Sequence, residues 1–193
     1  MRVELKSVPP SRSDYALKPN AARALTDGEV ALARRVFGNA IDYACVRVFR
    51  RKWFPFQPRR VTMAPRGNLH FHPNGSAYSD DFALEPLRRQ GLFIHELTHV
   101  WQVQTRGIWF LVLKRHPFCR YDYTLVPGRR LEDYGIEQQA MIVQHAFWLR
   151  NGMRIAGVAD ASAYDSLVRF EGATDAGYRL RNPPVQAERR GRV

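Results

Sequence analysis

Hydrophobic residues recur with the period of an α-helix in the middle of the chain. The pattern predicts a helix that starts between Asp81 and Pro86, runs to about Thr105 and ends before Gly107. One face of this helix is apolar, with Phe93, Leu97 and Val100. The opposite face is polar, so we expect the helix to pack one side against a core and turn the other toward a polar environment.

A second helical pattern begins at about Leu131 or Gly135 and ends at Arg150, before Asn151 and Gly152. Its apolar stripe contains Ile136, Ala140, Val143 and Phe147. Glu137 lies on the border of this stripe, and a carboxylate that faces the interior is costly unless it has a partner. Glu137 is therefore a candidate for a functional role.

The remaining patterns predict shorter elements. Thr26 and Glu29 have the spacing of a capping box, so a helix is expected from there to about Phe37, with Gly38 as its C-terminal stop. A short turn is expected at 39–44, and one more short helix at 161–170. Residues 108–113 are apolar and fit either a strand or continued packing after Gly107.

Strand patterns lie between the first helix and the central one. Residues 45–50 alternate in the way expected of a strand, and residues 61–64 and 69–72 flank a turn-forming segment, which predicts a β-hairpin. The fold class is therefore α+β, with a small N-terminal sheet packed on the central helix. We expect one domain over residues 26–181, a flexible arm at 1–25 and a disordered basic tail at 182–193.

Composition adds a strong positive charge. The 193 residues carry a formal net charge of +12, which suits an anionic partner or an arginine-rich solvated surface. No segment has the length and hydrophobicity of a membrane span or a signal peptide, so the cytoplasm is the expected location, with export by a non-classical route left open. Cys45 and Cys119 form no paired motif and are expected to be reduced thiols.

The central helix contains His95-Glu96-Leu97-Thr98-His99, the HExxH pattern of zinc hydrolases. Histidines four residues apart share one helix face, so both imidazoles can reach one Zn²⁺ ion. Glu96 is turned about 100° further around the helix, where it can reach a metal-bound water and serve as general base.

A catalytic zinc ion usually has three protein ligands and one open position. Glu137 is the predicted third ligand because it occupies an inward position with no other evident purpose. His145, His116 and Glu132 are the alternatives.

These motifs resemble a known group of proteins. The HExxH helix followed by a glutamate on a second helix is similar to the gluzincin branch of the zincin metallopeptidases. More narrowly, residues 95–102 and 134–140 resemble short bacterial proteins of the Vgr-related or Rhs type, over about residues 25–150. The resemblance implies a zincin-like fold, zinc-dependent hydrolysis of peptide bonds, and association with type VI secretion. Met141 stands where an Asp or Asn often follows the glutamate ligand, which leaves the residues that support the ligands undefined.

A zinc peptidase also needs a donor for the oxyanion of its transition state. Tyr134, one turn before Glu137, is the predicted donor, with Tyr121, Tyr123 and His116 as alternatives. In this scheme Glu96 takes a proton from the attacking water and passes it to the leaving amine.

Two other functions remain open. One is a secretion-associated binding or adaptor protein in which zinc is structural. The other is a protease recruited to nucleic acid, as SprT-like proteins are, for which the basic and aromatic residues of 50–60 would supply contacts to phosphates and bases. A partly packed loop is the simpler interpretation of that segment. His70 and His72 alternate to one strand face and are expected to be packing or surface residues, and the strand itself could pair with an extended substrate.

Overall fold

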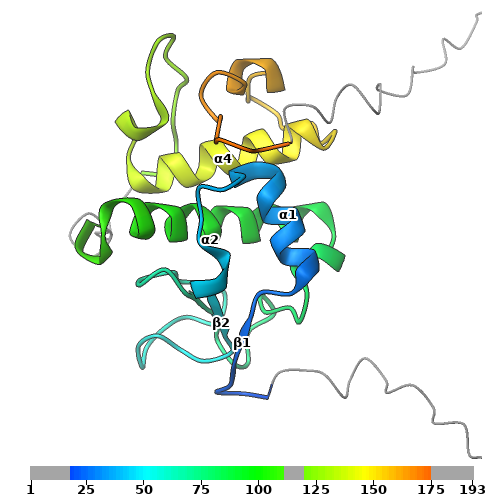
Figure 1. Cartoon of the computed structure of the whole chain (residues 1–193), viewed down its shortest axis with the longest axis vertical. Coiled ribbons are helices and arrows are strands. Elements are labelled where there is room, and N and C mark those ends of the chain that lie inside the picture. The colour runs from blue at the N-terminus through cyan, green and yellow to red at the C-terminus, as the bar shows by residue number, and fades with distance from the viewer. Residues whose placement is uncertain (1–17, 111–119, 175–193) are drawn as a thin grey trace, which may run out of the picture.

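Two long helices, α2 (Leu87–Arg106) and α4 (Ile136–Arg150), lie side by side at the centre of the molecule (Figure 1). The structure, a computed structural model, describes residues 18–110 and 120–174. Both helices match the predicted ranges, and Gly107 ends α2 with a φ of +83°. The helical periodicity therefore located the two elements that carry the candidate site.

A glycine allows the two helices to approach closely. A Cβ atom at Gly91 of α2 would lie 2.0 Å from Nε1 of Trp148 on α4, a distance that no side chain tolerates. The same Nε1 donates a hydrogen bond of 2.9 Å to the carbonyl oxygen of Leu87. The indole therefore joins the two helices at the N-terminal end of α2.

Helix α1 (Asp27–Phe37) begins and ends as its sequence predicts. The Thr26 hydroxyl accepts a hydrogen bond from the Glu29 amide, and the Glu29 carboxylate accepts one from the Thr26 amide, which completes a capping box. Gly38 follows with a φ of +52°, where a Cβ atom would collide with the backbone of residues 171–173. A short 3₁₀ turn, η2 (Tyr43–Cys45), lies close to the turn expected at 39–44.

The sheet has three short strands in the order β1-β2-β3: β1 (Ala22–Ala24), β2 (Arg47–Phe49) and β3 (Leu69–His70). β1 pairs with β2 in antiparallel fashion, whereas β2 and β3 are parallel, with Val48 opposite Leu69. Parallel strands need a long crossover connection. Residues 50–68 form that crossover, and they include the basic and aromatic segment.

The predicted hairpin of 61–64 and 69–72 forms only in part. Only one antiparallel bridge joins the two segments, between Met63 and His70. The ladder does not extend because Pro65 has no amide hydrogen, and because the Gln57 side chain donates to the Val61 carbonyl oxygen at 2.7 Å. Leu69 and His70 also continue the sheet beside β2.

β1 lies inside the segment that was expected to be a flexible arm. Arg23 of this strand forms an ion pair of 2.7 Å with Glu29, whose side chain is fully buried. Glu29 also accepts a hydrogen bond from the Phe82 amide at 3.0 Å. A buried carboxylate with this many donors fixes β1, α1 and the segment before α2 to one another, so the ordered structure starts before residue 26.

The remaining elements are short. Three 3₁₀ turns flank the long helices: η3 (Phe82–Leu84), η4 (Leu131–Asp133) and η5 (Ala161–Tyr164). The last of these replaces part of the helix expected at 161–170. Residues 108–110 are helical rather than extended, and residues 111–113, the N-terminal part of the arm and the basic tail lie outside the described residues. No helix in the described part of the chain is long and apolar enough to cross a membrane.

An aromatic stack connects the sheet side to α2. The ring of Phe82 stacks on Phe71 at 5.2 Å and on Phe93 at 5.1 Å, and all three side chains are fully buried. In Figure 1, α2 lies between α4 and the sheet, so its two faces are both covered. This arrangement confirms the predicted α+β class.

Candidate metal centre

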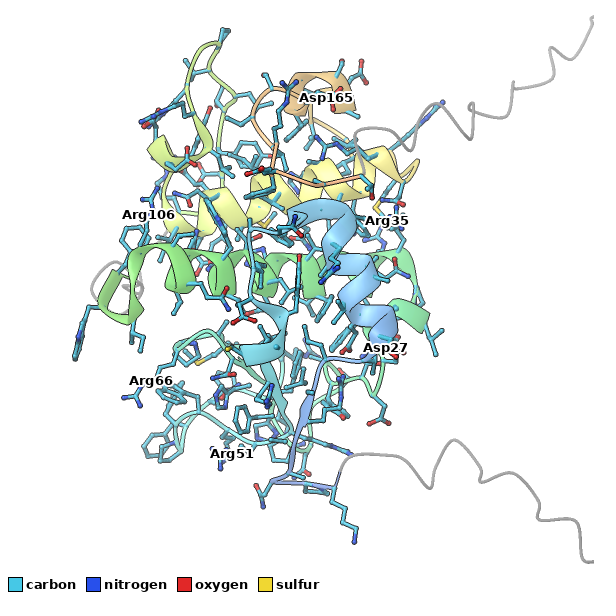
Figure 2. The ribbon with its side chains drawn as sticks, viewed as in Figure 1. Asp27, Arg35, Arg51, Arg66, Arg106 and Asp165 are labelled. Atoms are coloured by element: carbon cyan, nitrogen blue, oxygen red, sulfur yellow. The ribbon has the colours of Figure 1, made fainter. Side chains whose placement is uncertain are left out.

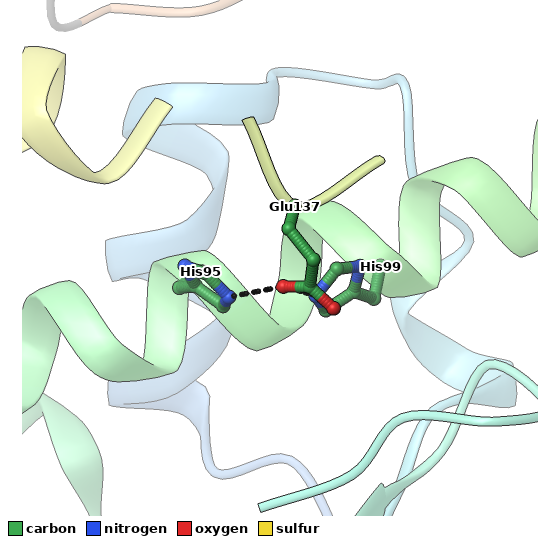
Figure 3. Close-up of side chains that lie close together, drawn as sticks. All are labelled: His95, His99 and Glu137. Atoms are coloured by element: carbon green, nitrogen blue, oxygen red, sulfur yellow. Dashed lines mark ion pairs between the residues drawn. The ribbon is translucent and has the colours of Figure 1, made fainter. Parts of the chain in front are cut away.

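Three ligand-type side chains meet between α2 and α4 (Figure 3). His95 and His99 project from one face of α2, as residues four apart must, and their ring centroids are 5.1 Å apart. Glu137 reaches down to them from the first turn of α4. All three are buried, with 8%, 0% and 1% of their surfaces exposed.

The distances within this cluster match those of a metal site. Oε2 of Glu137 lies 3.4 Å from Nε2 of His95 and 3.2 Å from Nε2 of His99. Ligands about 2.0–2.2 Å from a tetrahedral zinc ion are separated by about 3.3–3.6 Å, close to the two distances here. Within residues 18–110 and 120–174, no second group of His, Cys, Asp or Glu side chains brings three ligand atoms this close. The residues present can therefore hold a metal ion.

A chain of side-chain amides determines which nitrogen of His99 carries the hydrogen. Nε2 of Gln102 donates to the Ile136 carbonyl oxygen at 3.0 Å and to Oε1 of Gln139 at 2.9 Å. Nε2 of Gln139 donates in turn to the Tyr134 carbonyl oxygen at 2.7 Å. Because backbone carbonyls only accept, both amide orientations are defined.

The orientation of the Gln102 amide fixes the tautomer of His99. Oε1 of Gln102 must be the acceptor at its 2.9 Å contact with Nδ1 of His99, so Nδ1 carries the hydrogen. The lone pair is then on Nε2, the atom that faces Glu137 and can bind a metal ion. Gln102 and Gln139 thus supply the support for the ligands that Met141 does not provide. Sequence reasoning missed this role, although Gln102 falls on the histidine side of the helix.

The predicted general base, Glu96, lies next to His95 on α2 and is 4% exposed. Of the alternatives for the third ligand, neither Glu132 nor His145 belongs to the cluster. Glu132 is exposed. Nδ1 of His145 contacts the hydroxyl oxygen of Tyr123 at 2.7 Å, and His116 falls outside the described residues.

Two tyrosines and His145 form a second polar group on the α4 side. The hydroxyl oxygen of Tyr123 lies 2.7 Å from both Nδ1 of His145 and the hydroxyl oxygen of Tyr164. Burial, and secondarily the nearby His95, lower the pKa of His145. Burial and the contact with Tyr164 raise the pKa of Tyr123, so its hydroxyl stays protonated. A cavity of about 270 Å³ lies beside this group, with Tyr123, Leu125 and Tyr164 in its wall.

Tyr134, the predicted oxyanion donor, is buried below Arg129. Its hydroxyl oxygen accepts a hydrogen bond of 3.0 Å from the Val126 amide, which leaves the hydroxyl hydrogen to be donated. Tyr121 is half exposed. The role of Tyr134 stays a prediction.

The strand histidines are not part of the metal cluster. His70 is 3% exposed and its ring stacks on Phe49 at 4.6 Å. Burial, and secondarily Arg51, lower the pKa of His70 to about 4, so the ring is neutral at pH 7. His72 accepts a hydrogen bond from the Asn74 amide at 3.0 Å. Both are packing residues, as expected from the sequence.

The fold and this site define a small α+β protein with a buried His-His-Glu group able to bind a metal ion. No model of an established family matches the chain. It is 44% identical, over 138 residues, to the type VI secretion system spike protein VgrG2b of Pseudomonas aeruginosa. That match covers 68% of the chain and 13% of the spike protein, so the chain spans a small part of that relative's length.

The solved effector domain of Pseudomonas aeruginosa VgrG2b has a similar structure. The TM-score is 0.60 with 38% sequence identity, and the match covers 77% of this chain and 84% of the domain. The chain therefore belongs to the family of the VgrG2b effector domain.

Proposed function

We propose that this protein is a zinc-dependent peptidase with a zincin-like arrangement of its helices. The observation that carries the proposal is the approach of His95, His99 and Glu137 to one point, with Nε2–Oε2 distances of 3.4 and 3.2 Å. Two imidazoles and one carboxylate are a set that suits zinc and leaves a fourth position for chemistry. Such a composition distinguishes catalytic zinc sites from structural ones, which usually have four protein ligands.

When bound, zinc would act as a Lewis acid that polarises the substrate carbonyl and makes water acidic enough to be deprotonated near neutral pH. Residues of the chain would supply the proton transfer and the stabilisation of the oxyanion. Glu96 would accept the proton of the attacking water and return it to the leaving amine. Tyr134, or Tyr123 supported by His145, would donate a hydrogen bond to the developing oxyanion. The cavity beside Tyr123 would accept one side chain of the peptide.

Glu137→Ala and Glu96→Gln separate metal binding from catalysis. Glu137→Ala should abolish stoichiometric zinc, measured by elemental analysis, because two histidines alone hold zinc weakly. Glu96→Gln should retain zinc but lose about 10²-fold to 10⁴-fold in hydrolysis of a denatured protein substrate. Glu132→Ala, a change at an exposed glutamate five residues before Glu137, is the matched control and should alter neither. Full zinc content in a folded Glu137→Ala protein would refute the ligand assignment.

The transition-state donor is tested on the two tyrosines separately. Tyr134→Phe and Tyr123→Phe should both retain zinc, and the donor is the one whose loss lowers kcat by about 10²-fold. If neither substitution changes kcat, the oxyanion is stabilised by a group other than these hydroxyls.

A second candidate function is that of a secretion-associated effector or adaptor in which the metal is structural. The relationship to the effector domain of a type VI spike protein favours an association of this chain with that secretion system. Chelator-sensitive turnover that returns on adding zinc supports the peptidase. A zinc-containing protein that cleaves no polypeptide, and whose free energy of unfolding falls when zinc is removed, supports the structural role.

A further inference from the structure

The crossover between β2 and β3 displays apolar side chains to solvent. Phe56 is 88% exposed, and Trp53, Phe54 and Val61 are each 38–39% exposed. We call residues 50–66 the basic-aromatic loop. Isolated exposed apolar residues are ordinary, but several on one connection form a patch of the kind that binds a partner.

The loop is held in this conformation by a buried glutamine. Gln57 is 3% exposed, and its Oε1 accepts a hydrogen bond from the Trp53 amide at 2.7 Å. Its Nε2 donates to the carbonyl oxygens of Val61 at 2.7 Å and His70 at 3.1 Å. These three bonds fasten the loop to itself and to β3. The exposure of Phe56 is therefore a consequence of an ordered loop.

Cations surround the exposed rings. The exposed basic residues of the loop are Arg51, Lys52, Arg59, Arg60 and Arg66. The sequence contains no Asp or Glu between Asp42 and Asp80, so no acidic residue of this segment offsets them. Arg51 and Arg66 project from the side of the molecule that carries the sheet, away from α4 (Figure 2). A patch that is both apolar and positive fits a partner that is both apolar and negative.

The arrangement of the rings favours a lipid surface over a nucleic acid. Base stacking requires free ring faces. The Phe49 ring is stacked on His70, with the Arg51 guanidinium 4.6 Å from its centroid. Arg66 covers the Trp53 ring at 5.2 Å. The rings that project are those of Phe54 and Phe56, 38% and 88% exposed on either side of Pro55, and they offer apolar surface without a hydrogen-bonding group.

We propose that the basic-aromatic loop binds the surface of a bilayer that contains anionic lipids. Phe54 and Phe56 insert between the headgroups, and Arg51, Lys52, Arg59 and Arg60 contact the lipid phosphates. This surface is separate from the metal centre, which lies between α2 and α4 on the other side of α2. The inference is independent of the proposed peptidase activity.

The test is co-sedimentation of the full chain with vesicles. The protein should bind vesicles of equimolar phosphatidylcholine and phosphatidylglycerol, should not bind vesicles of phosphatidylcholine alone, and should be released by high salt. The double variant Phe54→Ser/Phe56→Ser should bind the mixed vesicles at least about tenfold more weakly, because two phenyl groups no longer leave water. Arg59→Gln/Arg60→Gln should have a similar effect, since each cation near an anionic surface contributes about 1 kcal/mol, or about fivefold.

Matched controls change the same residue properties elsewhere. Leu84→Ser removes an apolar side chain that is 67% exposed, and this variant should bind the mixed vesicles like wild type. Arg154→Gln/Arg169→Gln removes two exposed cations, and its loss of vesicle affinity should be smaller than that of Arg59→Gln/Arg60→Gln. An unchanged free energy of unfolding, measured in urea, shows for every variant that the fold is retained. Absence of binding at low salt, or equal binding by Phe54→Ser/Phe56→Ser, overturns the proposal. Binding of single-stranded DNA without binding of vesicles would assign the loop to nucleic acid instead.

Discussion

The two sides of α2 depart from ordinary protein architecture in opposite ways. Toward α4, the molecule buries two histidines, Glu137 and a chain of glutamine amides. Toward the sheet, it exposes aromatic rings on a connection between strands of two and three residues. Buried polar groups and exposed apolar groups are the two observations that burial preferences do not explain. These two departures are the observations on which the two proposed roles rest.

The largest predicted effect tests how firmly the sheet side is attached. Arg23→Leu would leave Glu29 buried without its ion-pair partner, and breaking one side of a buried pair costs about 3–5 kcal/mol. The free energy of unfolding, measured in urea, should fall by that amount. Arg154→Leu, at an exposed arginine, should change it by less than about 0.5 kcal/mol. Equal stability of the two variants would contradict the assignment of β1 to the folded domain.

A smaller effect is expected when the pH is lowered. The pKa of His70 is lowered from 6.5 to about 4 in the folded chain, so between these values the unfolded chain binds more protons. The stability associated with the neutral ring is fully present above pH 6.5 and decreases as the pH falls toward 4, by as much as about 3 kcal/mol.

His70→Phe isolates this contribution because it retains an aromatic ring for the stack on Phe49. Urea unfolding at pH 7 and pH 4.5 should give a smaller pH-dependent loss for the variant than for wild type. Equal losses in the two proteins would show that His70 is protonated as readily in the folded chain as in the unfolded one.

The three long helices could be predicted from local sequence patterns. α1, α2 and α4 were located correctly because their caps and apolar stripes are local patterns, and HExxH is itself local to one helix. The approach of Glu137 to the histidines was predictable because its inward position needed a partner.

The sheet was not predictable in the same way. β1 and β3 are three and two residues long, and their pairing depends on contacts between distant segments, such as Arg23 with Ser79 and Gln57 with His70. Turn signals at 65–68 favoured a longer local hairpin than the single Met63–His70 bridge that forms, and β3 pairs with β2 through its other edge. The role of Gln139, whose side chain fixes the orientation of the Gln102 amide, was also not predictable, because a glutamine at that position has no distinctive sequence pattern.

The smallest predicted effect concerns the side-chain amide of Gln102 and tests whether it supports His99 in the metal centre. Gln102→Leu would remove the acceptor of the His99 Nδ1 hydrogen, so Nδ1 and Nε2 would compete for it and a smaller fraction of His99 would present a lone pair toward Glu137. Zinc affinity, measured by competition with a chelator, should fall about 10-fold to 100-fold. Gln104→Leu changes the same residue type two positions further along α2, where the side chain is exposed and bonds to Asp42, and should leave zinc affinity unchanged. Unchanged zinc affinity in a folded Gln102→Leu protein would show that Gln102 only fills space beside His99.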